Sequence, residues 1–369
     1  MAHTNFVTKR LNAKAKREVF MSREWYNLRS ILGYDWALFY LLLGGREAGK
    51  SYAVTEFYVR QWKKYGRPFI WLRLTDTAQE KLLMNNAEKL IDPDIRRKYK
   101  LDIFRQGTNV YEVTKRSKPD ENGKTKILEK KLMARVFALS TFYSDKGSGL
   151  FDKDFLNDPK MYYNIAFDEM NREKGEKNTF DIVYSFTNQL ENLVRSTKTR
   201  LRIICIGNTL EEASDLLCAF NFIPEQFGRF KLKKKRAVVE YIEPSEAYKA
   251  RRKGTVADIL MPTASTFTNE IKTDTTLVYK GTLHKPERII KFSKIDKENF
   301  VVWDNNVITK WNGQYLKTKI AMKPYLDEIF NADARNAVFQ IFDGRGFKFK
   351  DLITFKQFQK NLELLRPRR

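Results

Sequence analysis

Short apolar runs alternate with helix-like stretches through the first two thirds of the chain. The runs have the length and the aliphatic and aromatic content of buried strands, and they fall at residues 36–43, 68–74, 133–139, 163–167 and 201–207. Residues 52–64, which follow the first run and its glycines, predict a helix. Because buried strands that alternate with helices are typical of parallel sheets, residues 31–228 predict an α/β domain.

The remaining segments have other patterns. Residues 1–30 alternate basic and apolar positions and predict a basic N-terminal arm. Residues 229–269 hold a basic run at 231–236, a strand-like stretch and a polar segment, and they predict a basic linker region. Residues 270–369 predict a second, smaller α+β domain. Its expected strands and helices are 276–281, 287–293, 299–303, 307–311 and 314–319, then 323–342 and 354–365.

A glycine-rich loop directly follows the first predicted strand. The stretch from Gly44 to Ser51 matches the phosphate-binding pattern G-x-x-x-x-G-K-[ST], between a strand and a helix as that motif requires. Glycines let backbone N–H groups turn inward around phosphates, and the helix N-terminus favours their charge. We therefore expect nucleotide contacts from Gly44, Gly45, Arg46, Glu47, Ala48, Gly49, Lys50, Ser51 and Tyr52. Lys50 would reach the β- and γ-phosphates, and the Ser51 hydroxyl would ligate Mg²⁺.

An acidic pair follows a second predicted strand. Residues 162–169 form an apolar run that ends in Asp168 and Glu169, which is the Walker B form. Asp168 is expected to hold Mg²⁺, and Glu169 to orient and deprotonate the attacking water. Two carboxylates, rather than Asp168 alone, favour hydrolysis over binding.

A third predicted strand delivers Asn208 to the edge of the sheet where ligands of open α/β folds bind. A polar amide there can sense the γ-phosphate or place the water. No N-K-x-D motif for guanine recognition occurs, so ATP is preferred to GTP.

The formal net charge of +24 indicates an extended polyanionic partner, and nucleic acid is the first expectation. The longest apolar stretch is far shorter than the ~20 residues of a membrane-spanning helix, and no secretory signal pattern opens the sequence. Two cysteines and two histidines cannot build a zinc cluster or a disulfide framework. Cys205 and Cys218 are interpreted as core residues rather than reactive thiols.

Four segments together resemble the DNA-packaging ATPases of small tailed phages of the Picovirinae type. They are Tyr34-Asp35 leading into residues 44–51, Lys64-Tyr65-Gly66 with Phe69-Ile70, residues 167–174 (F-D-E-x-x-R-E-K), and residues 220–225 continuing to Arg229-Phe230. The resemblance spans roughly residues 31–230, and the third segment is far more specific than a Walker B motif alone.

This resemblance implies an ASCE-type, RecA-like P-loop ATPase that uses ATP and Mg²⁺. It implies a homo-oligomeric ring, commonly a pentamer, at the portal of an empty procapsid, which drives double-stranded DNA inside. In some relatives a structural RNA bridges motor and portal. The implied location is the host cell cytoplasm and, transiently, the procapsid portal vertex, with no membrane and no place in the mature virion.

The resemblance also implies two residues donated across the subunit boundary and a particular second domain. The trans lysine falls on Lys146, and the trans arginine falls best on Arg195, with Lys198 and Arg200 as alternatives. Residues 270–369 would resemble an RNase H-like nuclease that has lost its catalytic carboxylates.

Residues 114–131 predict an exposed hairpin with basic residues on both sides of its turn. Nucleic-acid contacts are expected there, and the run from Lys231 is a second candidate for contact with DNA or RNA. The expected contact residues are Lys115, Arg116, Lys118, Lys124 and Lys126. Alternative functions are a single-core DNA helicase, a partition-type ATPase, or an RNA-binding scaffold with a nucleotide switch.

Overall fold

The computed structural model describes residues 25–141, 162–171, 180–194, 200–208, 214–260, 262, 275–292, 299–311 and 332–365. Contact clustering divides the chain into two compact units. Unit 1 comprises residues 1–209 and 224–271, and unit 2 comprises residues 210–223 and 272–369.

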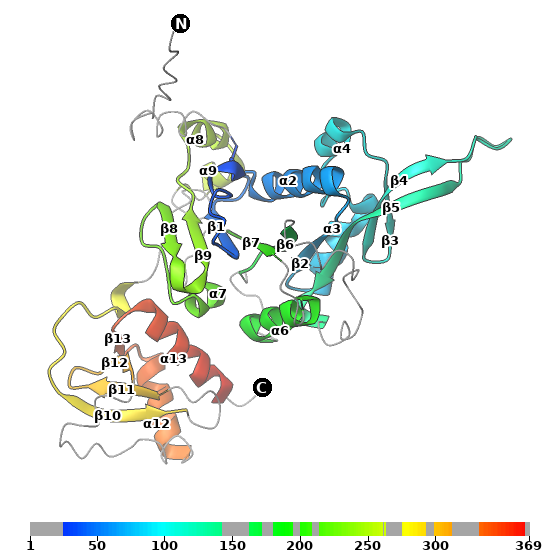
Figure 1. The fold of residues 1–369 in the computed structure, drawn as a ribbon. Coiled ribbons are helices and arrows are strands. Elements are labelled where there is room, and N and C mark those ends of the chain that lie inside the picture. The colour runs from blue at the N-terminus through cyan, green and yellow to red at the C-terminus, as the bar shows by residue number, and fades with distance from the viewer. Residues whose placement is uncertain are drawn as a thin grey trace, which may run out of the picture. The chain divides into compact units, whose positions relative to one another are not determined.

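Unit 1 is built on a nine-stranded sheet among its described residues, with strand order β3-β4-β5-β2-β6-β7-β1-β9-β8 (Figure 1). Neighbouring strands from β5 to β9 pair in parallel, and the pairs β3–β4, β4–β5 and β8–β9 are antiparallel. The strands are β1 (Phe39–Gly44), β2 (Phe69–Arg73), β3 (Ile103–Gln106), β4 (Asn109–Arg116), β5 (Ile127–Ala138), β6 (Tyr162–Asp168), β7 (Arg200–Asn208), β8 (Gly228–Leu232) and β9 (Ala237–Tyr241). The predicted α/β class with a parallel central sheet is confirmed.

Helices cover both faces of this sheet. The helical elements of unit 1 are η1 (Leu28–Ser30), α2 (Lys50–Tyr65), α3 (Asp76–Ala87), α4 (Pro93–Tyr99), α6 (Ile182–Val194), η3 (Lys233–Lys235), α8 (Glu246–Arg252) and α9 (Val256–Leu260). On one face Tyr58 of α2 packs on Trp71 and donates a hydrogen bond to the carbonyl of Ile165 (2.8 Å). On the other face Phe186 of α6 stacks on Phe167. Since successive strand residues point to opposite faces, both sides of the central strands are buried.

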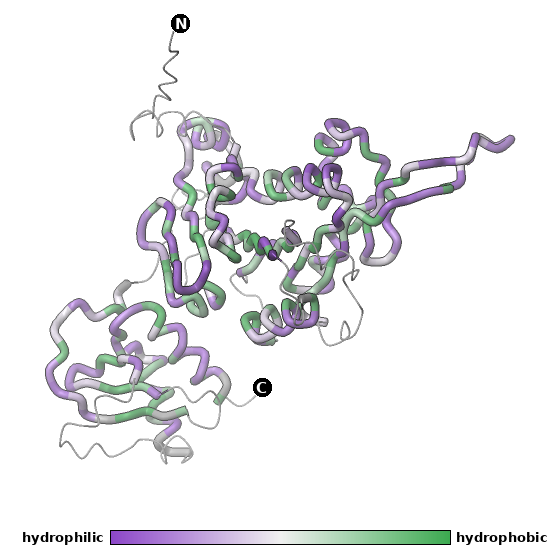
Figure 2. The backbone as a smooth tube through the Cα atoms, in the orientation of Figure 1, coloured by the Kyte–Doolittle hydropathy of each residue, from purple (hydrophilic) through white to green (hydrophobic). Residues whose placement is uncertain are grey.

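The sheet extends beyond its parallel part as a long hairpin. Strands β4 and β5 project away from the other strands, and the tip of the hairpin is hydrophilic (Figures 1 and 2). The first half of β5 pairs only with β4, whereas Ala134 to Ala138 also pairs with β2. The structure therefore contains the hairpin predicted for residues 114–131, and β5 begins earlier than the predicted strand at 133.

The segment predicted as a linker, 229–269, is instead part of unit 1 and supplies strands β8 and β9 of its sheet. All five residues of β9 are buried, and β9 pairs in parallel with β1 from Phe39 to Leu43. The basic run lies at the exposed turn between β8 and β9. Its lysines suggested a solvated connection, whereas the β-branched residues beside it form a strand next to the central one.

Unit 2 holds a four-stranded sheet among its described residues, in the order β10-β11-β12-β13. Its elements are α7 (Asp215–Ala219), η4 (Thr275–Leu277), β10 (Pro286–Lys291), β11 (Asn299–Trp303), β12 (Val307–Lys310), α12 (Ala332–Asp343), β13 (Lys348–Phe349) and α13 (Leu352–Leu365). Phe300, Phe349 and Phe358 join the sheet to α13 in one aromatic core.

Several elements predicted for residues 270–369 agree with the described part of unit 2. The expected strand at 276–281 is instead a short 3-10 turn followed by a single bridge from Val278 to Phe349. The expected strand at 314–319 lies outside the described residues. The mixed sheet with helices agrees with an α+β domain, and the RNase H-like likeness stays a prediction.

Candidate functional site

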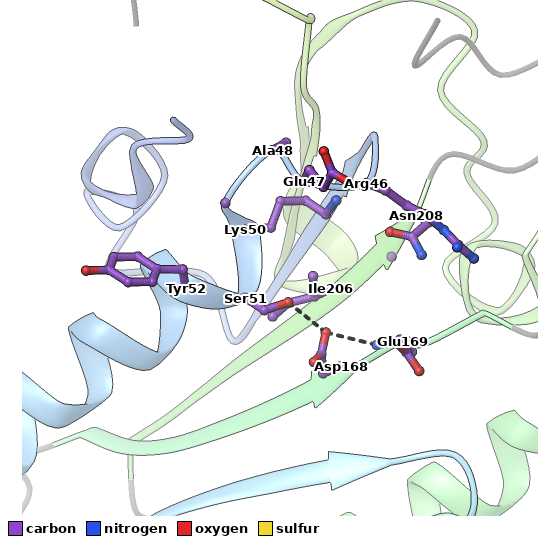
Figure 3. Close-up of a pocket in the computed structure, with 12 residues that line it drawn as sticks. Arg46, Glu47, Ala48, Lys50, Ser51, Tyr52, Asp168, Glu169, Ile206 and Asn208 are labelled. Atoms are coloured by element: carbon purple, nitrogen blue, oxygen red, sulfur yellow. Dashed lines mark hydrogen bonds between the residues drawn. The ribbon is translucent and has the colours of Figure 1, made fainter. Parts of the chain in front are cut away.

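A cavity of about 460 Å³ opens where three strands of unit 1 end. Strands β6, β7 and β1 are neighbours in the sheet and run in the same direction, so their carboxyl ends lie side by side. The register places Gly44 opposite Asn208 and Asp168 opposite Ile206. The lining residues are Arg46, Glu47, Ala48, Gly49, Lys50, Ser51, Tyr52, Asp168, Glu169, Ile206, Gly207 and Asn208 (Figure 3).

The loop between β1 and α2 has the backbone that its glycines predict. Gly49 stands just before α2 with φ of 80°, in the left-handed region that glycine adopts freely. Glu47 also has a positive φ of 61°, which is uncommon for a residue with a side chain. The loop thus turns tightly into the helix N-terminus, where anions are favoured.

Lys50 points back into its own loop. Its ammonium donates hydrogen bonds to the carbonyls of Gly44 (2.8 Å) and Gly45 (2.6 Å), and the residue is 5% exposed. Burial lowers the pKa of Lys50 to about 8, an effect that Asp168 opposes and Arg46 reinforces. A buried ammonium of this kind gains when a phosphate dianion enters the cavity, because the phosphate replaces the lost hydration.

Ser51 and Asp168 meet across the cavity floor. The Ser51 hydroxyl donates to Asp168 Oδ1 (3.0 Å), and Asp168 is 6% exposed at the end of β6 (Figure 3). Among the described residues no group of three or more His, Cys, Asp or Glu side chains could hold a metal alone. One hydroxyl and one carboxylate do suit Mg²⁺, which is usually bound by one or two carboxylates together with substrate phosphates. The residues present therefore fit that ion.

Arg73 joins the two carboxylates, and the motif search missed it. This arginine ends β2, is 9% exposed, and donates to Asp168 Oδ2 (2.8 Å) and to a carboxylate oxygen of Glu169. Glu169 has a φ of 55°, and its N–H donates to Asp168 Oδ1 (3.1 Å). A charged residue that closes an apolar run was the available signal, because the strand before it is buried throughout. Strand β2 lies beside β6, so the guanidinium reaches both acids.

The remaining predicted residues fall into two groups. Asn208 ends β7 in the cavity lining, as expected. Lys146 and Arg195 lie outside the described residues.

The predicted nucleic-acid residues lie on the hairpin rather than around the cavity. Arg116 pairs with Asp102 (2.5 Å), and Lys115 with Glu129 (3.7 Å).

In the described part of the chain, no helix is both long and apolar enough to cross a membrane.

A parallel sheet, a glycine loop between its strand β1 and a helix, and an acidic pair at the end of β6, with β7 between these two strands, define a P-loop NTPase. The residues that match a known family extend from 21 to 336. The chain belongs to the family of podovirus DNA encapsidation proteins (Gp16).

Individual relatives agree with this assignment. The DNA packaging proteins of Bacillus phage PZA and Bacillus phage phi29 are each 25% identical to the chain over 210 residues. That alignment covers 56% of this chain and 53% of each relative, so the chain spans about half the length of the curated relatives it matches.

A solved structure, the bacteriophage Phi-29 viral genome packaging motor assembly, has a similar fold. The TM-score is 0.59 at 19% identity, with 93% of this chain and 100% of that chain covered. At this identity the likeness concerns the fold alone.

Proposed function

We propose that this chain is an ATP-hydrolysing motor subunit that moves double-stranded DNA into a preformed procapsid. The observation that carries the proposal is the convergence of Lys50, Ser51, Asp168 and Glu169 on one cavity in unit 1. Membership of a DNA encapsidation family and the fold shared with a genome packaging motor support DNA as the transported polymer and the procapsid as its destination.

In the proposed reaction each cavity residue has a separate task. Lys50 would bind the β- and γ-phosphates, and Ser51 and Asp168 would hold Mg²⁺, which would supply charge neutralisation at the phosphates. Glu169 takes a proton from the attacking water, and Asn208 places that water or contacts the γ-phosphate. Arg73 fixes Glu169 and offsets part of the negative charge of the two acids.

Completion of this site by a neighbouring subunit is also part of the proposal. Lys146 and Arg195 are proposed to act in trans, with Lys198 and Arg200 as alternatives for the arginine. Positive charge at the γ-phosphate stabilises the transition state only when subunits are docked. The proposed assembly is therefore a homo-oligomeric ring, with five subunits by family resemblance.

The proposed partners are double-stranded DNA, the portal of the procapsid and a structural RNA. Strong positive charge supports polyanion binding, and the proposed place of action is the host cytoplasm and the portal vertex.

ATP hydrolysis is tested with Glu169→Gln. We expect this variant to lose ATPase activity by about 10²-fold or more, the usual contribution of a general base, and to bind ATP as the parent does. Turnover and equilibrium ATP binding are measured on the assembled subunits, with Glu191→Gln, on α6, as the matched control. Parental turnover in Glu169→Gln would show that the base is misassigned.

Transport is tested by ATP-dependent entry of DNA into procapsids, with and without added RNA. Nuclease-protected DNA is expected only with ATP and with the parent chain. Strand separation of a forked substrate without entry would favour a helicase, and tight RNA binding with negligible turnover would favour a scaffold.

A further inference from the structure

Every backbone carbonyl of the glycine loop has a hydrogen-bond donor. Lys50 takes those of Gly44 and Gly45, and the N–H of Ala53 takes that of Gly49 within the first turn of α2. The three carbonyls between them, at residues 46–48, are bound by segments far away in the sequence. This outer set of donors lies on α8 and on the chain just before η1.

Helix α8 supplies donors to two of these carbonyls. Tyr248 donates its hydroxyl to the carbonyl of Arg46 (2.8 Å), and Arg252 approaches the same oxygen (3.4 Å) while pairing with the Glu47 carboxylate (3.2 Å). Arg251 donates to the carbonyl of Glu47 (2.5 Å). Tyr248 and Arg252 are buried at 3% and 6% exposure, so these are not loose surface contacts.

The chain before η1 supplies the donor to the third carbonyl, that of Ala48. The N–H of Tyr26 binds the carbonyl of Ala48 (2.9 Å). The Trp25 ring lies where a Cβ on Gly49 would contact it at 3.1 Å, and the Arg251 guanidinium stacks on that ring at 3.8 Å. Arg251 thereby links the two segments that surround the loop.

Because each peptide is planar, the contacts to the carbonyls on the outside of the loop fix the direction of its N–H groups. The C=O and N–H of one trans peptide point in opposite directions. Carbonyls 46, 47 and 48 are held toward α8 and Tyr26, so the N–H groups of residues 47, 48 and 49 face the other way. Anion-binding loops need inward N–H groups of this kind. The positive φ of Glu47 is an uncommon backbone conformation that persists where surrounding contacts enforce it.

We propose that α8 is the element that holds the glycine loop open for phosphate, with Tyr248, Arg251 and Arg252 as positioning residues. The proposal rests on the nucleotide-binding function proposed above. Because binding linkage is reciprocal, phosphate in the cavity stabilises α8 to the same extent that α8 stabilises phosphate binding. We therefore expect phosphate in the cavity to increase the local stability of α8.

The test compares Tyr248→Phe and the double variant Tyr248→Phe/Arg252→Ala with Lys249→Ala. Lys249 lies on the same helix but pairs only with its neighbour Glu246, on an exposed face, in the described structure. Equilibrium binding is measured with Mg²⁺ and either ATP or inorganic tripolyphosphate. The double variant should bind both probes roughly tenfold more weakly, the size expected for one or two lost buried hydrogen bonds.

Tripolyphosphate separates loop positioning from contact with the base. Equal fold-losses for the two probes support the proposal, whereas a loss confined to ATP would mean that α8 contacts the nucleoside and would overturn it. Steady-state kinetics should show a raised KM for ATP with a nearly parental kcat, because Asp168 and Glu169 are untouched.

Hydrogen exchange of α8 is the second readout, and it does not depend on turnover. Amides of residues 246–252 should become more protected when tripolyphosphate binds the parent chain, and this gain should shrink in the double variant. Unchanged affinity and unchanged protection in folded variants would overturn the role of α8 alone. Failure of the parent to bind ATP would instead overturn the proposed function.

Discussion

The Arg73 guanidinium contacts both carboxylates of the acidic pair in the site. It lies 95 positions from Asp168 in the sequence, yet the two side chains form a nearly buried ion pair. Removing one member of such a pair leaves an uncompensated charge in a poorly hydrated place. The interaction therefore connects the stability of unit 1 with the orientation of the proposed base.

Arg73→Ala should destabilise the fold and reduce turnover together. We expect the free energy of unfolding to fall by about 3 kcal/mol, the usual cost of breaking a buried pair, and ATPase activity to fall at least about tenfold as Glu169 loses its partner. Denaturant unfolding and steady-state turnover measure the two effects. Arg97→Ala, which breaks an exposed pair with Asp94, is the matched control and should cost at most about 1 kcal/mol.

The two cysteines should be unreactive in the folded protein. Burial raises the pKa of the Cys205 thiol in β7, and it raises that of Cys218 to about 12 with a contribution from Asp215. Since the thiolate is the reactive form, both stay protonated in mildly alkaline buffer. Iodoacetamide labelling followed by mass spectrometry should modify neither thiol until guanidinium chloride is added. Rapid native labelling of Cys205 would contradict its place in the sheet.

Contiguous motifs were readable from the sequence, and tertiary pairings were not. The loop from Gly44 to Ser51 and the pair Asp168-Glu169 are short, and their chemistry restricts the residue types directly. Arg73, Tyr248 and Arg252 reach the same cavity or its wall from distant elements, and an arginine or tyrosine in a helix or at a strand end has many possible partners.

At the scale of elements, the prediction of a linker at residues 229–269 failed for a physical reason. The run of lysines before β9 suggested a solvated connection, yet β9 itself pairs beside β1 and is buried along its length. The strand-like stretch after the lysines was recognised in the sequence, but its pairing with β1, about 200 residues earlier, could not be read from the local pattern. The hairpin was predicted more easily, because its turn residues and its two alternating arms follow one another in the sequence.

The hairpin tip is the element on which DNA gripping can be tested. Replacing Lys118, Lys124 and Lys126 by Ala should weaken binding to duplex DNA and reduce the salt slope of log K by up to about three, at roughly 0.9 per phosphate contact. ATP binding should be unchanged, because these residues lie outside the cavity lining. Fluorescence anisotropy over a series of salt concentrations measures the slope.

A second triple variant removes the same charge elsewhere. Lys81, Lys89 and Lys100 are exposed on and near α3 and α4, and their replacement by Ala should leave the salt slope as it is. An equal loss in both triples would mean that net charge, and not the hairpin, accounts for DNA binding. The same measurement on Lys233, Lys234 and Lys235 decides whether the β8–β9 turn contributes.

At the scale of the whole molecule, unit 2 is formed by two separate segments of the chain. Residues 210–223, which follow Thr209, belong to unit 2 and contribute α7, and the chain rejoins unit 1 at Pro224 before β8. Leu216 and Leu217 are buried at 2% and 3% exposure, and α7 packs against α13. Unit 2 is therefore not a C-terminal module that can be removed at one boundary.

Truncation after Ile271 should yield a chain that binds nucleotide but associates through exposed apolar surface. The truncated chain keeps the cavity residues and loses the helix against which α7 packs. Size-exclusion chromatography and dye binding measure this, and Leu216→Ser with Leu217→Ser in the truncated chain should restore a single monodisperse species. A monodisperse truncation without these changes would contradict the assignment of α7 to unit 2.

Because α7 precedes α13 in the chain, α7 is synthesised well before the helix against which it packs. More than a hundred residues separate Ala219, where α7 ends, from Leu352, where α13 begins. Ribosomes add about 5–20 residues per second, so α7 waits on the order of ten seconds for its partner helix. During that interval the nascent chain can complete its nucleotide-binding sheet, while the leucines of α7 still lack α13 to pack against.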